Sequence, residues 1–279
     1  MIDLKALRDD PGYRTAIERK RVEPGLIDEV LSLDAELRAQ QQLVEQLRAR
    51  QKSASKEIGR AEPQQREALQ RDAAAAKEEL KRGEDELTIL DQRLRGLALQ
   101  VPSPADLSVP DGGEGDAEVL RVVGDTPAPP PLDHAAFAEA MGFVETRHAA
   151  ESSGSRFASL MREAVLLELA LVQWVMGRLV GEGFTPVVPP VLVREDAMVE
   201  AGFFPTDRNQ VYDVDDGELF LVGTSEVPLS TLHRGERLTE DALPARYAGF
   251  STCFRREAGT HGKDTRGIFR VHQFDKVEM

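Results

Sequence analysis

Two runs of regularly spaced, mostly apolar residues, here called seams, constrain the fold of residues 1–100. They are similar in length and are separated by a short helix-breaking segment. In both seams the residues recur at alternating spacings of three and four, which is the heptad pattern of coiled-coil helices. Glutamines interrupt the first seam and small residues the second. The first seam is Val30, Leu33, Leu37, Gln40, Val44, Leu47, Gln51, Ala54 and Ile58, and the second is Leu69, Ala73, Ala76, Leu80, Gly83, Leu87, Leu90, Leu94 and Leu97. Gly59 and Pro63 lie between the seams, so the pattern predicts an antiparallel helical hairpin.

The end of the first seam is basic, although the whole chain has a net charge of −14. Because the local field rather than the total charge attracts a polyanion, this acidity does not exclude RNA binding. The candidate RNA-binding residues are Arg48, Arg50, Lys52, Lys56 and Arg60. Periodicity alone leaves two other interpretations open, a solvated coiled coil and a dimerisation zipper.

The chain is expected to be an α+β protein with two domains. A helical arm over 1–100 precedes a proline- and glycine-rich linker over 101–131 and a second domain over 132–279. In the second domain we expect a short helix over 132–141 and a long helix over 156–182 that carries Trp174 into the core. Short apolar runs predict mostly antiparallel strands over 184–193, 210–214, 218–222, 246–256 and 267–278.

Composition narrows the class of protein further. No run of 18 apolar residues is present, and the first residues lack the pattern of an export signal, so we expect a cytoplasmic protein without a membrane span. The single cysteine, Cys253, excludes an internal disulfide and is interpreted as a small core residue. His261 and His272 lack partners at metal-ligand spacing, so we expect hydrogen-bonding or surface roles for them.

The densest polar constellation lies near the carboxyl end. Because strand side chains alternate faces, Arg255 and Glu257 are expected to share one face of the first strand. The matching face of the next strand carries Arg270, His272, Phe274, Lys276 and Glu278. Guanidinium groups, carboxylates and a ring on one surface suit a nucleotide, although an ordinary solvated hairpin remains an alternative. The segment from Gly259 to Asp264 fails as a P-loop because its spacing is short and Asp264 replaces the magnesium-binding Ser or Thr.

These residues resemble the signature motifs of class II aminoacyl-tRNA synthetases. The pattern from Phe254 to Glu278 is similar to the second motif, and Gly183–Leu192 is similar to the first, which builds a dimer interface. Gly223-Thr224-Ser225-Glu226 resembles the serine-recognition loop of seryl-tRNA synthetases. The helical arm, the proline-rich connection and Leu132-Asp133-His134 follow the layout of the same family.

The resemblance implies a role for each matching residue. Arg255 and Arg270 are the implied catalytic residues, which hold the α-phosphate and the terminal phosphate of ATP. The implied ATP site comprises Arg255, Arg256, Glu257, Arg270, Val271 and Phe274, with Glu257 on the adenine amino group and Phe274 stacked on the base. The implied serine site comprises Thr224, Ser225, Glu226, Arg255 and Glu278.

The same resemblance implies substrates and partners. They are ATP with Mg²⁺, L-serine, tRNA(Ser) and also tRNA(Sec), and a second copy of the chain that docks through Gly183–Leu192. No metal ligand is assigned within the chain. The family's third motif, which is glycine-rich and bears an arginine, is expected to lie past residue 279, so the catalytic domain is expected to be incomplete and the chain alone inactive.

Three alternatives compete with a serine–tRNA ligase. One is a catalytically silent relative that binds tRNA. Another is a synthetase-like ligase that charges a carrier protein, which has little use for a long arm. The last is a structural coiled-coil protein, which leaves the motifs near the carboxyl end unexplained.

Overall fold

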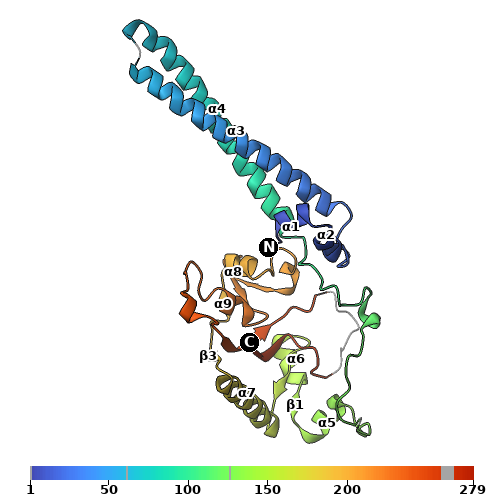
Figure 1. The fold of residues 1–279 in the computed structure, drawn as a ribbon. Helices are drawn as coiled ribbons and strands as arrows, with labels where there is room; N and C mark the ends of the chain where they lie inside the picture. The colour runs from blue at the N-terminus through green and yellow to red at the C-terminus, as the bar shows by residue number, and fades with distance from the viewer. Residues whose placement is uncertain (1, 61, 126, 259–266) are drawn as a thin grey trace. The chain divides into compact units, whose positions relative to one another are not determined.

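The computed structural model describes residues 2–60, 62–125, 127–258 and 267–279 (Figure 1). Its internal contacts divide the chain into two compact units, one up to Val122 and one from Val123 to Met279. This division falls inside the segment expected to be a linker, and the individual domain limits of 100 and 131 stay predictions.

Two short helices form the base of the first unit. Helix α1 (Leu4–Asp9) is capped by the carboxylate of Asp3, and helix α2 (Pro11–Glu18) by that of Asp10. Pro11 is the first residue of α2, where its missing N–H has no helical partner to lose. Pro11 therefore suits the start of a helix.

Two long antiparallel helices confirm the predicted hairpin (Figure 1). They are α3 (Leu26–Arg60) and α4 (Pro63–Ala98), which pack along one another. The buried seam residues are Val30, Leu33, Leu37, Val44 and Leu47 in α3 and Ala76, Leu80, Leu90 and Leu94 in α4. Each buried leucine contributes about 1.5–3 kcal/mol relative to an exposed one, so the apolar seam is the main force that holds the hairpin together.

The glutamine at the middle of the first seam has a partner on the facing helix. Gln40 Nε2 donates a hydrogen bond of 3.0 Å to the carbonyl oxygen of Gly83. A Cβ atom at Gly83 would lie 3.3 Å from Val44 and 3.4 Å from Leu47. The glycine thus allows close helix contact, and the partly buried amide is satisfied rather than left unpaired.

A buried carboxylate joins the base to the hairpin. Asp34 in α3 accepts hydrogen bonds from Arg8 in α1 at 2.7 Å and from Arg38 at 3.1 Å. Asp34 is only 4% exposed, so its charge needs these partners inside the protein.

The first part of the predicted linker packs on the first unit. Val101 is buried in the core of that unit, and Ala105 N donates to Ala16 O at 2.9 Å. The guanidinium of Arg19 donates to the carbonyl of Val109. Only a 3₁₀ turn, Glu114–Asp116, forms between Val101 and the second unit.

In its described residues, the second unit combines one long helix and several short ones with three small sheets. The helices are α5 (His134–Met141), α6 (Arg147–Ser153), α7 (Glu163–Gly181), α8 (Glu195–Glu200) and α9 (Glu226–Ser230), with 3₁₀ turns at Arg208–Gln210 and Glu240–Ala242. The strands are β1 (Val144–Glu145), β2 (Ser159–Leu160), β3 (Thr185–Val187), β4 (Leu192–Val193), β5 (Tyr212–Val214), β6 (Leu219–Leu221), β7 (Tyr247–Phe254) and β8 (Gln273–Glu278).

The sheets are mostly antiparallel, as expected. Strands β1 and β2 form one antiparallel pair, and β4, β6 and β5 form a second antiparallel sheet. In the third sheet β7 pairs in parallel with β3 and antiparallel with β8. The α+β fold class is confirmed.

Several expected element limits are wrong. The long helix begins at Glu163 instead of 156, because β2 occupies Ser159–Leu160. The strand expected over 184–193 is two strands in different sheets, β3 and β4. Sequence periodicity did not show that the chain changes sheets within a single apolar run.

Helix α7 exposes an apolar face. Trp174 is 63% exposed, so the expectation that it lies in the core is wrong. Leu166, Leu167, Leu169 and Leu171 are also exposed. Among the described residues α7 is the one helix long and apolar enough to cross a membrane by length and composition. A single helix of this kind is weak evidence for a membrane protein, because core helices of soluble proteins can have the same length and composition.

Candidate active site

The site is built on the antiparallel pair of β7 and β8. Their register places Cys253 opposite Phe274, Ser251 opposite Lys276 and Gly249 opposite Glu278. Because the side-chain period of a strand is two, Phe274, Lys276 and Glu278 share one face of β8. This part of the predicted surface is present.

The remaining site residues lie beyond the strand ends. Strand β7 ends at Phe254 and β8 begins at Gln273, so Arg255, Glu257 and Arg270 do not alternate along strands as expected. They nevertheless converge. Together with Ile268, Phe269, Val271 and Phe274 they line a hollow of about 480 Å³.

The charged groups of this hollow contact one another. Arg270 forms an ion pair with Glu257. The guanidinium of Arg255 lies 5.1 Å from the centre of the Phe274 ring, within range of a cation–π contact. Arg255 Nε also donates to the carbonyl oxygen of Gly223 at 3.3 Å, which links the hollow to the loop before α9.

A second polar cluster adjoins the hollow on the same face of β8. The hydroxyl of Thr224 donates to the carboxylate of Glu278, and Lys276 Nζ contacts both Thr224 Oγ1, at 3.0 Å, and Glu278. Burial raises the pKa of Glu278, but hydrogen bonds from Lys276 and Thr224 outweigh it, so this pKa lies below its ordinary value.

The loop before α9 lies directly on β7 because of a glycine. A Cβ atom at Gly249 would lie 2.8 Å from Leu229 Cδ1 and 3.0 Å from Ser225 Cβ. Ser225 is fully buried, and its hydroxyl bonds to that of Ser251 at 2.7 Å. Ser225 therefore anchors the loop, and its burial does not favour the direct ligand contact predicted for it.

The other predicted site residues lie near these two clusters. Glu226 is exposed at the start of α9, and its backbone N–H donates to Thr224 Oγ1 at 3.1 Å. Arg256 is exposed, and its backbone N–H donates to the carbonyl of Gln210 at 2.8 Å. Their ligand-binding roles stay predictions.

The sequence placed Lys276 on the same strand face as Glu278 but gave it no role, whereas the structure pairs the two side chains. Sequence reasoning missed Gln210 altogether. Gln210 lies more than forty residues before Ala258, and its side chain bonds to the backbone of Ala258. No local pattern marks such a contact.

The expected roles of Cys253 and His272 agree with the structure. Cys253 is buried in β7, and this burial raises the pKa of its thiol, which suits an inert core residue rather than a nucleophile. His272 Nδ1 donates to the carbonyl oxygen of Arg255 at 2.8 Å. The P-loop-like segment Gly259–Asp264 and His261 lie outside the described residues.

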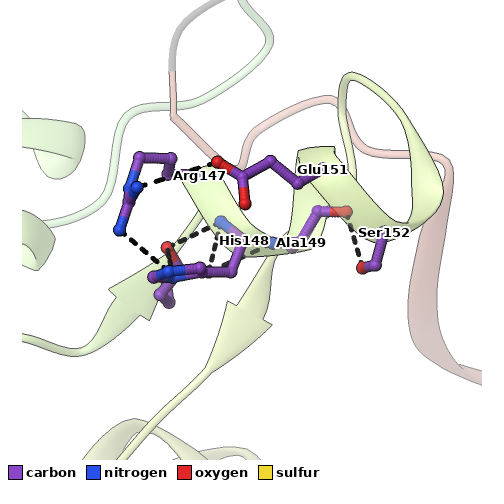
Figure 2. Close-up of polar contacts among 6 residues, drawn as sticks. Arg147, His148, Ala149, Glu151 and Ser152 are labelled. Atoms are coloured by element: carbon purple, nitrogen blue, oxygen red, sulfur yellow. Dashed lines mark hydrogen bonds and ion pairs between the residues drawn. The ribbon is translucent and has the colours of Figure 1, made fainter.

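Figure 2 shows another polar cluster, at the start of α6. The carboxylate of Glu145 accepts hydrogen bonds from the backbone N–H groups of His148, at 2.9 and 3.0 Å, and Ala149, at 3.1 Å. The bond from His148 N–H is the main reason that the pKa of Glu145 lies below its ordinary value. This cluster caps a helix, and nothing in it indicates catalysis.

Comparisons with known proteins show which family the chain belongs to. Residues 1–104 match the seryl-tRNA synthetase N-terminal domain, and residues 209–279 match the tRNA synthetase class II core domain (G, H, P, S and T). The serine–tRNA ligase of Thermobifida fusca is 46% identical over 283 residues, covering 100% of this chain and 67% of that protein. The chain belongs to the seryl-tRNA synthetase family.

Other members of the family extend this likeness. The serine–tRNA ligase of Mycobacterium tuberculosis is 45% identical over 280 residues and is covered to 67%. The crystal structure of seryl-tRNA synthetase from Pyrococcus horikoshii complexed with ATP has a TM-score of 0.89 and 32% identity, over 99% of this chain and 68% of that one. The Naegleria fowleri enzyme in complex with AMP has a TM-score of 0.82 and 27% identity, over 99% and 66%.

The chain spans about two thirds of the length of the curated relatives it matches. The expectation that this chain alone is inactive stays a prediction.

Replacing Lys276 tests the cluster around Glu278. In Lys276→Met, the pKa of Glu278 should rise because the main hydrogen-bond donor that lowers it is lost. Since the pKa of Glu278 is depressed in the folded chain, its pairing stabilises the fold above the unfolded pKa. This stabilisation is lost as the pH falls through the pKa that Glu278 has in the folded chain. Because that pKa is higher in Lys276→Met, the variant should lose the stabilisation at a higher pH than the wild type. Carbon-13 NMR titration of the Glu278 carboxyl group measures the shift.

Lys52→Met, which removes an exposed ammonium group of the arm, is the control. An unchanged titration of Glu278 in Lys276→Met would contradict the pairing.

Proposed function

We propose that this chain carries the ATP-binding and serine-binding parts of a serine–tRNA ligase, which activates serine and transfers it to tRNA(Ser) and tRNA(Sec). One observation carries the proposal. The hollow of Arg255, Glu257, Arg270 and Phe274 lies beside the cluster of Thr224 and Glu278 on one face of the β7–β8 pair. A phosphate-binding region and an ammonium-binding region thus meet at Arg255.

ATP is proposed to occupy the hollow. Arg255 and Arg256 hold the α-phosphate, Arg270 holds the terminal phosphate, and the backbone of Val271 contacts the nucleotide. Glu257 accepts from the adenine amino group, and Phe274 stacks on the base. The ATP and AMP bound to the Pyrococcus horikoshii and Naegleria fowleri structures support this assignment. Arg270 and Glu257 pair with each other in the free site, so the nucleotide exchanges these contacts for its own.

Serine is proposed to bind at the polar cluster. Glu278 and Thr224 receive its ammonium and hydroxyl groups, Glu226 assists from the start of α9, and Arg255 holds the carboxylate. Ser225 supports Thr224 from behind. A site built to hydrogen-bond a hydroxyl group rejects alanine because its buried polar groups are then left unpaired.

The reaction needs positioning more than covalent help. The serine carboxylate attacks the α-phosphorus in line, pyrophosphate leaves, and cationic groups stabilise the charge. Magnesium neutralises phosphate oxygens in such reactions. Among the described residues no group of three or more His, Cys, Asp or Glu can hold a metal, and Glu257 and Glu278 both pair with cations. These residues do not fit a magnesium cage.

Removing the guanidinium of Arg255 tests the nucleotide site. Losing a charge-assisted contact to phosphate costs about 1.5–3 kcal/mol, so ATP binding to Arg255→Ala should weaken by roughly 10- to 100-fold. Isothermal titration calorimetry on the 279-residue chain measures it. Arg237→Ala, at an exposed position of the same unit, is the matched control. Equal affinities in the two variants would contradict the assignment.

The tip of the arm is proposed to bind tRNA through its phosphates, as suits RNA helices recognised by shape and backbone. Arg48 pairs with Glu84 at 2.8 Å, and Arg50 pairs with Glu79 at 3.4 Å across the hairpin. Lys52 and Lys56 are exposed one turn apart, and their ammonium groups make no ion pair within the described ranges. We therefore assign the main attraction to these lysines. The side chain of Arg60 lies outside the described part.

Reversing both charges tests the arm. Lys52→Glu with Lys56→Glu should weaken binding of tRNA(Ser) at low salt and reduce the salt slope of the binding constant by roughly 1 to 2, because fewer counterions are released. Filter binding at several salt concentrations measures both quantities. Lys5→Glu with Lys20→Glu, two exposed lysines at the base, changes the net charge equally. The same loss in both doubles would mean that total charge, not the tip, governs binding.

The exposed face of α7 is proposed to pack against a second copy of the chain. It is followed in the chain by Gly183–Leu192, which the resemblance implies for a dimer interface and in which Val188 is 80% exposed. A single-copy protein rarely leaves so many large apolar side chains on one helix in water.

Charges on this face should dissociate the dimer. Trp174→Glu with Val188→Glu should shift the chain to monomer in sedimentation equilibrium, because a buried unpaired carboxylate is costly. Leu243→Glu, at another exposed leucine of the unit (55%), should leave the dimer intact. A wild-type monomer, or a wild-type chain that partitions into lipid vesicles, would contradict the proposal.

A further inference from the structure

The side chain of Gln210 contacts the turn that carries Glu257. After Phe254 the chain leaves the sheet, and Glu257 adopts φ = +50°, a left-handed conformation that residues with side chains adopt at a cost. Such conformations persist where the surroundings over-determine them. At this turn the surroundings include Gln210.

Gln210 makes three hydrogen bonds to the two residues that flank Glu257. Its side-chain Nε2 donates to Ala258 O at 2.9 Å, and its Oε1 accepts from Ala258 N at 3.0 Å. Its backbone carbonyl accepts from Arg256 N at 2.8 Å. The side-chain amide thus pairs with both the N–H and the C=O group of Ala258, and it can do so in one orientation only, because donor and acceptor must each face their complement.

The residues around Gln210 give this contact a firm base. Gln210 ends the 3₁₀ turn Arg208–Gln210 and precedes the buried Val211 and strand β5. Strand β5 belongs to a different sheet from β7. The hydrogen bonds of Gln210 therefore connect the turn of Glu257 to the segment that leads into β5, which belongs to a different sheet.

We propose that Gln210 is a positioning residue for adenine recognition. It holds the backbone of 256–258 so that the Glu257 carboxylate points into the nucleotide hollow, and it does not itself contact the nucleotide. This inference rests on the proposed assignment of ATP to that hollow. The expected consequence concerns base selectivity. When the side-chain hydrogen bonds of Gln210 are removed, the site loses ATP affinity and its preference for adenine over guanine. The cluster of Thr224 and Glu278 is unaffected.

The experiment compares three variants in the 279-residue chain. Gln210→Ala removes both side-chain bonds. Gln210→Glu keeps the acceptor for Ala258 N–H but places a carboxylate oxygen against the Ala258 carbonyl. Asn209→Ala, one residue earlier and exposed in the same 3₁₀ turn, is the matched control. The readouts are amide hydrogen exchange at Arg256 and Ala258 by NMR, and calorimetric dissociation constants for ATP, GTP and L-serine.

Both Gln210 variants should show faster exchange at Ala258, about tenfold weaker ATP binding for the loss of one or two hydrogen bonds, and a smaller ratio of ATP to GTP affinity. Serine affinity should not change, and Asn209→Ala should behave as wild type.

Three results overturn the inference. They are unchanged exchange in Gln210→Ala, faster exchange without loss of ATP affinity or base preference, and an equal loss of serine affinity, which indicates general unfolding. A wild-type chain that binds no ATP instead removes the proposed nucleotide site, and the exchange data then still decide whether Gln210 holds the turn.

Discussion

The close contact between Gly249 and the loop before α9 is the constraint on which the site depends. Any side chain at Gly249 would meet Leu229 and Ser225 at 2.8–3.0 Å and push the loop away from β7. Gly249 also lies opposite Glu278 in the strand register. Because glycine has no Cβ atom, Thr224 can reach the carboxylate of Glu278. One glycine thus brings together two residues more than fifty positions apart in the sequence.

The charged groups of the site are held in place by one another before any ligand arrives. Glu257 pairs with Arg270, Glu278 with Lys276, and Arg255 lies over Phe274. Such pairing limits the cost of half-buried charge and restricts the side chains to a few positions. In the proposed function, a ligand with phosphate, carboxylate and ammonium groups replaces these partners with its own charges, so its binding exchanges ionic contacts instead of creating them from solvated groups.

The surfaces proposed for binding on the arm and on the second unit depend on different physical interactions. In the arm, a narrow apolar seam carries the stability, which leaves the outer faces free for charge. Its lysines at 52 and 56 are exposed, while neighbouring arginines pair across the hairpin with Glu84 and Glu79. In the second unit, the groups proposed to bind ligands lie where loops meet strand ends, and their backbone contacts packed neighbours such as Gln210.

The sequence by itself determined the helical hairpin and the set of site residues near the β7–β8 pair. A heptad seam is a local signal, because its members are neighbours on the same helix. Strand parity likewise placed Phe274, Lys276 and Glu278 on one face. Only the tertiary structure decided that β7 ends before Arg255, that Ser225 is buried against Ser251 and that Trp174 is exposed. Each of these depends on a partner distant in sequence, or on a surface that periodicity cannot assign, because the free energy of such contacts is set by packing between elements and not by the order of residues along one of them.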